Sequence, residues 1–158
     1  MQAIADELGV SRATVFRWVG NRDELIGEIL WSIAAPTLRR IVESTPGSGG
    51  KRVASILGTF CRVVVDNESF RTYLAKEPEA ALKVITRNAS TVQPRLVRWL
   101  EWLLAQEVEA GALDPPLPLP DLAYVIVRIV ETFTYTDLIT GEPPSPEKAE
   151  AAVAALLR

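Results

Sequence analysis

Residues 4–25 carry the pattern that most restricts how this chain can fold, two short apolar helices joined by a sharp corner. Ile4 and Leu8 lie one helical turn apart, and Gly9 follows where a left-handed backbone ends a helix without a Cβ clash. Ser11 is a residue type that begins a helix by accepting a hydrogen bond from a free backbone N–H. The pattern therefore predicts a helix that ends at Leu8 and a second that starts after Ser11.

The second helix combines small residues with cations on its outer side. Val15 and Val19 are four residues apart and form its apolar face. Small residues among arginines suit close approach to base edges and phosphates in a DNA groove. The residues that we expect on or near this reading surface are Arg12, Ala13, Thr14, Arg17 and Trp18.

A third helix is predicted to follow directly. Asn21, with Glu24 three residues later, has the spacing of a capping box, although Asn replaces the usual Ser or Thr. Arg22 then lies in the first turn, where its guanidinium can bind a DNA phosphate. We expect this helix to run toward Glu43 and to be bent or interrupted at Pro36.

Two structural alternatives accompany this interpretation. A corner between two apolar helices also occurs in plain helical hairpins of many folds. Trp18 has two possible positions, one in contact with DNA and one within the core of the head. The coincidence of corner, cap, small residues and cations within one window favours the DNA-binding interpretation.

This run resembles the TetR family of transcriptional regulators, in which an Ile-Ala pair, a Gly-Val-Ser corner, a Thr, an aromatic residue and a later basic residue recur at fixed spacing. The matching residues here are Ile4, Ala5, Gly9, Val10, Ser11, Thr14, Phe16, Arg22 and Leu25. The resemblance implies DNA contacts from Arg12, Ala13, Thr14, Phe16, Arg17 and Trp18, with Arg22 as a clamp on the DNA backbone. Phe16 stands where the family usually has Tyr, and Trp18 where His or Tyr is common.

The resemblance also implies one more helix before this unit. Met1 already falls inside the helix of Ile4, so we interpret the first helix as missing, through shortening or a start codon assigned too far downstream. Without it, Ile4, Leu8 and Val15 are expected to form an exposed apolar face. We therefore expect residues 1–158 alone to bind DNA weakly.

The composition argues against an enzyme. The chain has no histidine and one cysteine among 158 residues, so we expect no zinc or other metal site, no cofactor and no catalytic triad. No apolar run of membrane-spanning length or secretory leader is evident, and a cytoplasmic protein without membrane contact is expected. Cys61 lies in an apolar stretch and is predicted to be a buried structural thiol. The whole chain has a net charge of −3, but its first 22 residues hold three arginines and two carboxylates, so the head is locally basic.

The linker at residues 45–50 divides the chain into a DNA-binding and connecting unit, residues 1–44, and a ligand-binding and dimerisation body, residues 45–158. Apolar residues at helical spacing predict an all-α body. Its expected helices begin with an amphipathic one around residues 53–65 and continue at residues 69–75, 78–87, 92–110, 121–139 and 146–157.

The last two long helices carry more apolar surface than a small body covers, which predicts a four-helix bundle between two copies of the chain. An antiparallel pair within one chain is the alternative. A homodimer also places two recognition helices on successive major-groove faces of a palindromic site. The predicted interface residues are Ile126, Val130, Phe133, Val153, Leu156 and Leu157.

Aromatic residues near the centre of the body are the candidates for a ligand cavity, which the TetR resemblance implies. Trp99 and Trp102 on the long helix are the preferred lining residues. Arg128 and Glu131 either orient the polar end of a hydrophobic inducer or form an ion pair. The full predicted set is Phe60, Val64, Phe70, Tyr73, Trp99, Trp102, Tyr124, Arg128 and Glu131.

The sequence thus predicts a homodimeric TetR-type repressor that leaves a palindromic operator when a small-molecule inducer binds. Residues 17–25 are also similar to the branch that contains the regulator of quorum-signal lactone degradation, which implies a lactone-type inducer. The alternative is a helical small-molecule-binding or protein-interaction module whose helix-turn-helix no longer functions. Salt-dependent DNA binding separates the two.

Overall fold

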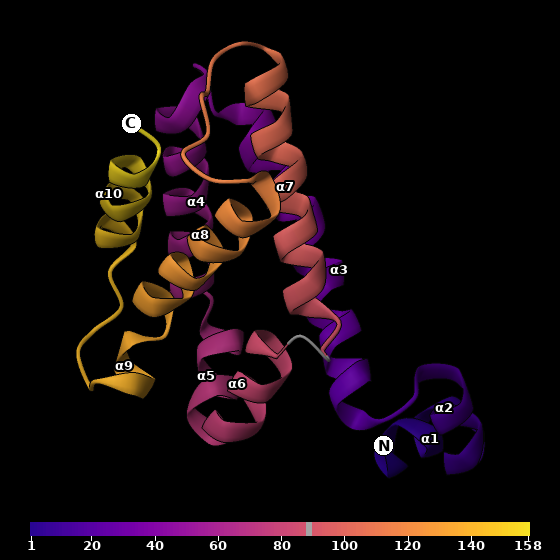
Figure 1. Ribbon diagram of the computed structural model, residues 1–158. Coiled ribbons are helices and arrows are strands. Elements are labelled where there is room, and N and C mark those ends of the chain that lie inside the picture. Colours follow the sequence, from indigo (N-terminus) through magenta and orange to yellow (C-terminus); the bar gives the residue numbers. More distant parts are fainter. Residues whose placement is uncertain (88–89) are drawn as a thin grey trace.

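A computed structural model describes residues 1–87 and 90–158, and these residues form helices and no strand (Figure 1). The all-α class predicted from the sequence is confirmed. The head consists of α1 (Gln2–Leu8), α2 (Arg12–Val19) and the start of α3 (Arg22–Ser44). The body comprises α4 (Gly49–Val65), α5 (Glu68–Lys76), α6 (Pro78–Thr86), α7 (Val92–Glu109), α8 (Leu119–Thr134), α9 (Thr136–Ile139) and α10 (Pro146–Leu156).

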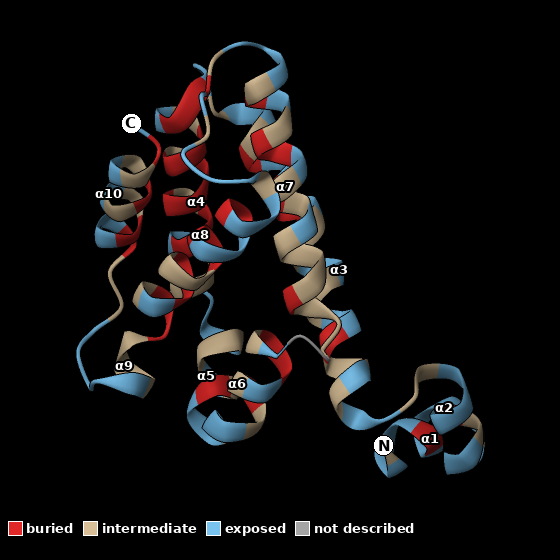
Figure 2. Cartoon of the chain, in the orientation of Figure 1, coloured by how far each residue is buried: buried red, intermediate tan, exposed pale blue. Residues whose placement is uncertain are grey.

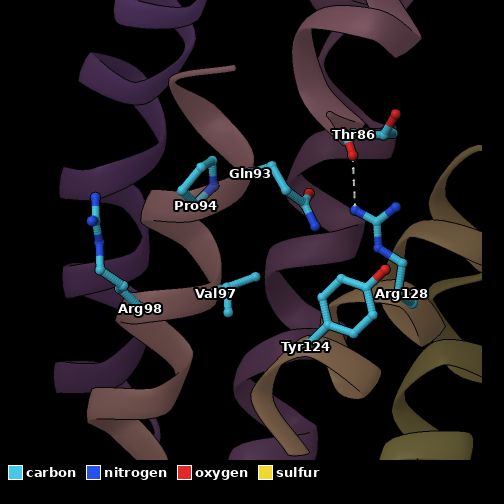
Figure 3. A pocket seen from close by; sticks show the side chains of 7 residues that line it. All are labelled: Thr86, Gln93, Pro94, Val97, Arg98, Tyr124 and Arg128. Carbon is cyan, nitrogen blue, oxygen red and sulfur yellow. Dashed lines mark hydrogen bonds between the residues drawn. The ribbon is translucent and has the colours of Figure 1, made fainter. Parts of the chain in front are cut away.

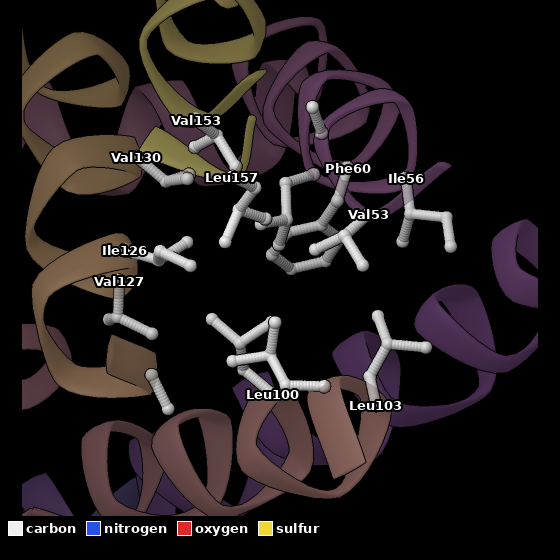
Figure 4. Close-up of a cluster of buried hydrophobic side chains, with 14 of the residues drawn as sticks. Val53, Ile56, Phe60, Leu100, Leu103, Ile126, Val127, Val130, Val153 and Leu157 are labelled. Carbon is white, nitrogen blue, oxygen red and sulfur yellow. The ribbon is translucent and has the colours of Figure 1, made fainter. Parts of the chain in front are cut away.

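The body is built around α4, whose apolar face is buried between its neighbours. Helices α3, α7, α8 and α10 all pack against it (Figures 1 and 2). Figure 4 shows the side chains that interlock in this core, from α4 on one side and from α7, α8 and α10 on the others. The labelled residues are Val53, Ile56, Phe60, Leu100, Leu103, Ile126, Val127, Val130, Val153 and Leu157.

Two glycines let α10 approach α4 closely. A Cβ added to Gly50 would lie 2.1 Å from the carbonyl oxygen of Leu157, and one added to Gly58 would lie 2.7 Å from the Cβ of Glu150. These residues are eight apart, so they share one face of the helix. The absence of side chains there brings the backbones together and positions the last helix.

A buried ion pair fixes the start of α4 against α7. The carboxylate of Glu107 accepts hydrogen bonds from Arg52 Nη1 and from the Gly49 backbone N–H, each at 2.6 Å. Arg52 also donates to the carbonyl oxygens of Thr45 and Val42, which belong to the end of α3. The chain after α3 is therefore held in place, and α4 already begins at Gly49, inside the predicted linker.

Two predicted helix features differ in the structure. Helix α3 continues through Pro36 without interruption, because Pro36 is exposed and the carbonyl left without its N–H partner can bind water. The helix predicted over residues 121–139 is divided at Tyr135 into α8 and α9. The turn places the Tyr135 ring in a second apolar cluster with Leu74 and Ile85, below the main core.

Cys61 is fully buried, as predicted, and its sulfur lies 3.1 Å from the hydroxyl of Thr134. Burial raises the pKa of the Cys61 thiol, so the thiol stays protonated and unreactive at neutral pH. Within the described residues, no helix is both long and apolar enough to cross a membrane.

Candidate DNA-binding head and ligand cavity

The corner between α1 and α2 has the predicted geometry. Gly9 adopts a left-handed conformation with φ of 64°, and its N–H donates to the carbonyl oxygen of Asp6 at 3.3 Å. The Ser11 hydroxyl accepts the Thr14 backbone N–H at 3.1 Å and caps α2. Local sequence alone therefore orients the second helix relative to the first.

Helix α2 presents the predicted reading surface to solvent. Arg12, Ala13, Phe16, Arg17 and Trp18 are exposed, and the guanidinium of Arg12 lies 5.3 Å from the Phe16 ring centroid. Trp18 has 59% of its surface exposed, so it does not pack in the core of the described residues, and its expected contact with DNA stays a prediction.

Two other positions of the head depart from the expectation of a fully exposed surface. Thr14 is half-buried, with its hydroxyl 2.8 Å from that of Ser11, so it supports the cap. The prediction that Ile4, Leu8 and Val15 form an exposed apolar face is wrong for Val15, which is buried between the helices. Ile4 and Leu8 are exposed, as predicted.

The capping box of α3 is confirmed, but Arg22 has a partner that the sequence did not indicate. The Asn21 side chain accepts the Glu24 N–H at 3.0 Å, and the Glu24 carboxylate accepts the Asn21 N–H at 3.1 Å. Both terminal nitrogens of Arg22 donate to Glu77 at 2.7 Å. This hydrogen bond raises the pKa of Arg22 and lowers that of Glu77. Contact with a DNA phosphate requires Arg22 to leave Glu77.

Two further ion pairs join the first half of α3 to the body. Lys83 of α6 lies 2.7 Å from Asp23, and Arg95 of α7 binds both carboxylate oxygens of Glu28 at 2.8 and 3.0 Å. These contacts lie on successive turns of α3. The position of the head is thereby tied to α6 and α7.

The larger of two cavities described here, called the main cavity below, has a volume of about 510 Å³ and lies between α3, α4, α5, α6, α7 and α8. Its walls are mostly apolar, which is typical of sites for small hydrophobic ligands. Five predicted residues line it, namely Phe60, Val64, Phe70, Tyr73 and Glu131.

Four predicted residues do not line the main cavity. The preference for Trp99 and Trp102 is wrong for both cavities that the structure describes, since Trp99 packs against the core and Trp102 is exposed on the outer side of α7. Tyr124 and Arg128 line a second cavity. The spacing of apolar residues correctly predicted that Trp99 and Trp102 lie on one helix, α7, but it did not show which face of α7 points toward the cavity.

The largest contribution that sequence reasoning missed comes from α3, which was interpreted only as a connector. Seven apolar or small residues of α3 face the main cavity, and their helical spacing is the signal that could have revealed them. They are Ile26, Ile29, Leu30, Trp31, Ile33, Ala34 and Thr37.

Polar side chains interrupt the apolar lining at Arg22, Thr37, Asn67, Ser69, Tyr73 and Glu131. The Tyr73 hydroxyl is buried without a hydrogen-bond partner among the described residues. Glu131 is 9% exposed, and its burial raises the pKa of the carboxyl to about 7, while its ion pair with Arg128 at 2.9 Å opposes the shift. Near neutral pH the Glu131 carboxyl therefore exists in both protonation states.

The second cavity, called the minor cavity below, has a volume of about 320 Å³ and shares no lining residue with the main cavity (Figure 3). It lies between the end of α6, the start of α7 and the middle of α8. Its lining residues are Thr86, Gln93, Pro94, Val97, Arg98, Tyr124 and Arg128.

The predicted dimer interface needs correction. Ile126, Val130, Val153 and Leu157 are buried in the core of this chain, because α8 and α10 pack against α4 through them. They cannot contact a second copy. Phe133 and Leu156 are half-buried. The exposed positions of α8 and α10 instead include Val125, Ala151 and Ala155.

Comparisons with known proteins agree with this architecture. The family model for the tetracyclin repressor-like C-terminal domain matches residues 48–158. A search among curated proteins gave no match. Among solved structures, the chain is similar to the transcriptional repressor QsdR of R. erythropolis, with 30% sequence identity and a TM-score of 0.90 over 99% of this chain and 82% of that chain. The helix-turn-helix head, the cavity-bearing helical body and these two matches together show that the chain belongs to the TetR family of transcriptional regulators.

Proposed function

We propose that this protein is a homodimeric repressor that binds a palindromic operator through α2 and is released when a small hydrophobic inducer fills the main cavity. Residues 1–44 serve as the DNA-binding and connecting unit, and residues 45–158 as the ligand-binding and dimerisation unit. The protein acts in the cytoplasm, where its operator lies.

The observation that carries this proposal is that α3 is both the support of the head and a wall of the main cavity. A ligand pressing on Ile29 or Ile33 contacts the helix that begins at the head. Because α3 is a single helix, displacement at the cavity is transmitted to the position of α2. The shift can be no larger than the difference in ligand affinity between the two head positions.

Two polar groups of the main cavity, the Tyr73 hydroxyl and the Glu131 carboxyl, suit a ligand with a carbonyl oxygen. The unpartnered Tyr73 hydroxyl can donate to a carbonyl, and protonated Glu131 can do the same. A lactone with an apolar tail has this chemistry, and its tail suits the apolar walls. QsdR, with which this chain shares 30% of its sequence, is a repressor of the same family.

The outward faces of α8 and α10 are the proposed dimer interface. Val125 is 36% exposed, and Ala151 and Ala155 on α10 are exposed small residues that permit close helix approach. Two copies joined there form a four-helix bundle. This arrangement replaces the interface residues that are buried inside one chain.

The proposal is tested by adding acyl lactones of increasing chain length to the protein bound to operator DNA selected from a random pool. Release from DNA and an increase in melting temperature should occur with the same lactones, because both report binding to one conformation.

Tyr73→Phe should lower the affinity for the effective lactone about tenfold without lowering stability, since it removes a buried hydroxyl that has no partner among the described residues. Tyr124→Phe, outside the main cavity, is the matched control. Specific operator binding that no lactone affects would refute the lactone inducer, and absence of sequence-specific binding even at protein concentrations that detect weak binding would refute the repressor itself.

A further inference from the structure

The minor cavity contains a buried amide whose hydrogen-bonding groups are all unused. Gln93 is 3% exposed, and neither its Nε2 nor its Oε1 atom has a hydrogen-bond partner among the described residues. Figure 3 shows the Gln93 side chain extending from α7 toward Arg128 and Tyr124 of α8. Buried polar groups are rarely left unpaired, so this amide indicates a partner outside the residues that the structure describes.

A second unused donor lies on Arg128. Its Nη2 donates to the carbonyl oxygen of Thr86 at 3.1 Å and lies 2.9 Å from Glu131, which holds the guanidinium in place. Its Nε is buried and has no hydrogen-bond partner among residues 1–87 and 90–158. The guanidinium carbon lies 5.4 Å from the centroid of the Tyr124 ring, so the ring covers one face of the cation.

These groups define the chemistry of a ligand. Gln93 Nε2 and Arg128 Nε are two donors, one of them charged, and together they suit the oxygens of a carboxylate. Gln93 Oε1 is an acceptor and requires an O–H or N–H on the same ligand. Pro94, Val97 and the Tyr124 ring provide apolar surface for the remainder.

We propose that the minor cavity is a second ligand site, specific for small organic carboxylates that carry a neighbouring hydroxyl or N–H group and an apolar substituent. This site shares no lining residue with the main cavity and does not rest on the proposed lactone response. Gln93 and Arg128 suit an anion, whereas Tyr73 and Glu131 of the main cavity suit a carbonyl oxygen.

Mandelate has the required carboxylate, adjacent hydroxyl and apolar ring, and serves as the probe. Titration of the whole chain without DNA, followed by calorimetry and by the NMR signals of the Gln93 side-chain amide, tests the site directly. We expect saturable binding that shifts the Gln93 amide signals. Phenylacetate, without the hydroxyl, and mandelamide, without the charge, should each bind at least tenfold more weakly.

Gln93→Leu retains the approximate size of the side chain and removes both polar groups. It should weaken mandelate binding at least tenfold, whereas Gln106→Leu, at an exposed position of the same helix, should leave it unchanged. No saturable binding, equal binding of phenylacetate, or signal changes confined to the main cavity would overturn the proposal. The Gln93 amide signals in the unaltered protein decide the matter even if Gln93→Leu does not fold. Because no DNA is present, failure here leaves the proposed repressor function untouched.

Discussion

Arg22 and Glu77 form a two-pronged ion pair, with both hydrogen bonds at 2.7 Å, between the first turn of α3 and the residue that precedes α6. Arg22 is also the residue expected to bind a DNA phosphate, and it lines the main cavity. One guanidinium is therefore within reach of the head, the body and the ligand. We therefore expect the Arg22–Glu77 ion pair to influence both DNA binding and ligand binding.

Releasing Arg22 should strengthen operator binding. Glu77→Gln removes the competing carboxylate, so Arg22 becomes available to a phosphate, and affinity should increase about two- to tenfold. The slope of log affinity against log salt concentration should steepen by about one, as expected for one added phosphate contact. Gel-shift titrations at several salt concentrations measure both quantities. Glu79→Gln, an exposed change on the same helix, is the control, and an unchanged slope for Glu77→Gln would show that Arg22 does not bind phosphate.

Glu131 should make stability depend on pH in an uncommon direction. Its pKa is raised from 4.5 to about 7 in the folded protein, so its protonated form stabilises the fold below pH 4.5. That contribution is lost as the pH rises through about 7 and amounts to at most about 3 kcal/mol. Urea unfolding between pH 5 and 8 should show stability decreasing relative to Glu131→Gln.

Glu147 offers a matched control of opposite sign. Its hydrogen bond from Arg62 lowers the carboxyl pKa, so its contribution is present at neutral pH and is lost only in acid. The free energy of unfolding of Glu147→Gln should therefore change with pH in parallel with that of the unaltered protein between pH 5 and 8. A constant difference between Glu131→Gln and the unaltered protein over this range would contradict the raised pKa.

Close packing of α4 and α10 should make Gly58 sensitive to substitution. In an open helix, Gly→Ala stabilises by up to about 1 kcal/mol. Here the added Cβ would lie 2.5 Å from Glu150 Oε2 and 2.7 Å from Glu150 Cβ, so α10 must move.

Gly58→Ala should therefore lower the free energy of unfolding in urea by about 1–3 kcal/mol, as overpacking of a core does. Ser55→Ala, a half-buried position of α4, should change stability by less than about 0.5 kcal/mol, and a stabilising effect of Gly58→Ala would show that the helices can separate.

The proposed dimer should dissociate when a charge is placed on the outward face of α8. Val125→Glu introduces a carboxylate that becomes buried and unpaired only if a second copy covers it. Analytical ultracentrifugation should show a monomer for this variant and a dimer for the unaltered protein. Ile139→Glu, at a residue of α9 that is 66% exposed, is the control. A Val125→Glu dimer of undiminished stability would place the interface elsewhere.

Local features of the head were predictable because they depend on residues close in sequence. The left-handed turn at Gly9, the cap at Ser11 and the capping box of Asn21 and Glu24 all use backbone groups within a few positions. The body helices were predictable for a similar reason, since helical periodicity needs only one segment at a time. The break at Tyr135 was not, because the second core that receives its ring comes from distant helices.

Local residue patterns were enough to predict the all-α class, the helix-turn-helix corner and the family resemblance. The packing of distant segments was needed to reveal that Arg22 pairs with Glu77, that Trp102 is exposed, that Ile126 and Val153 point inward, and that buried Gln93 has no hydrogen-bond partner among the described residues. The physical reason is that an apolar stripe shows that a helix must be covered, whereas the packing of helices far apart in the chain selects which element covers it and which polar groups are left facing a cavity.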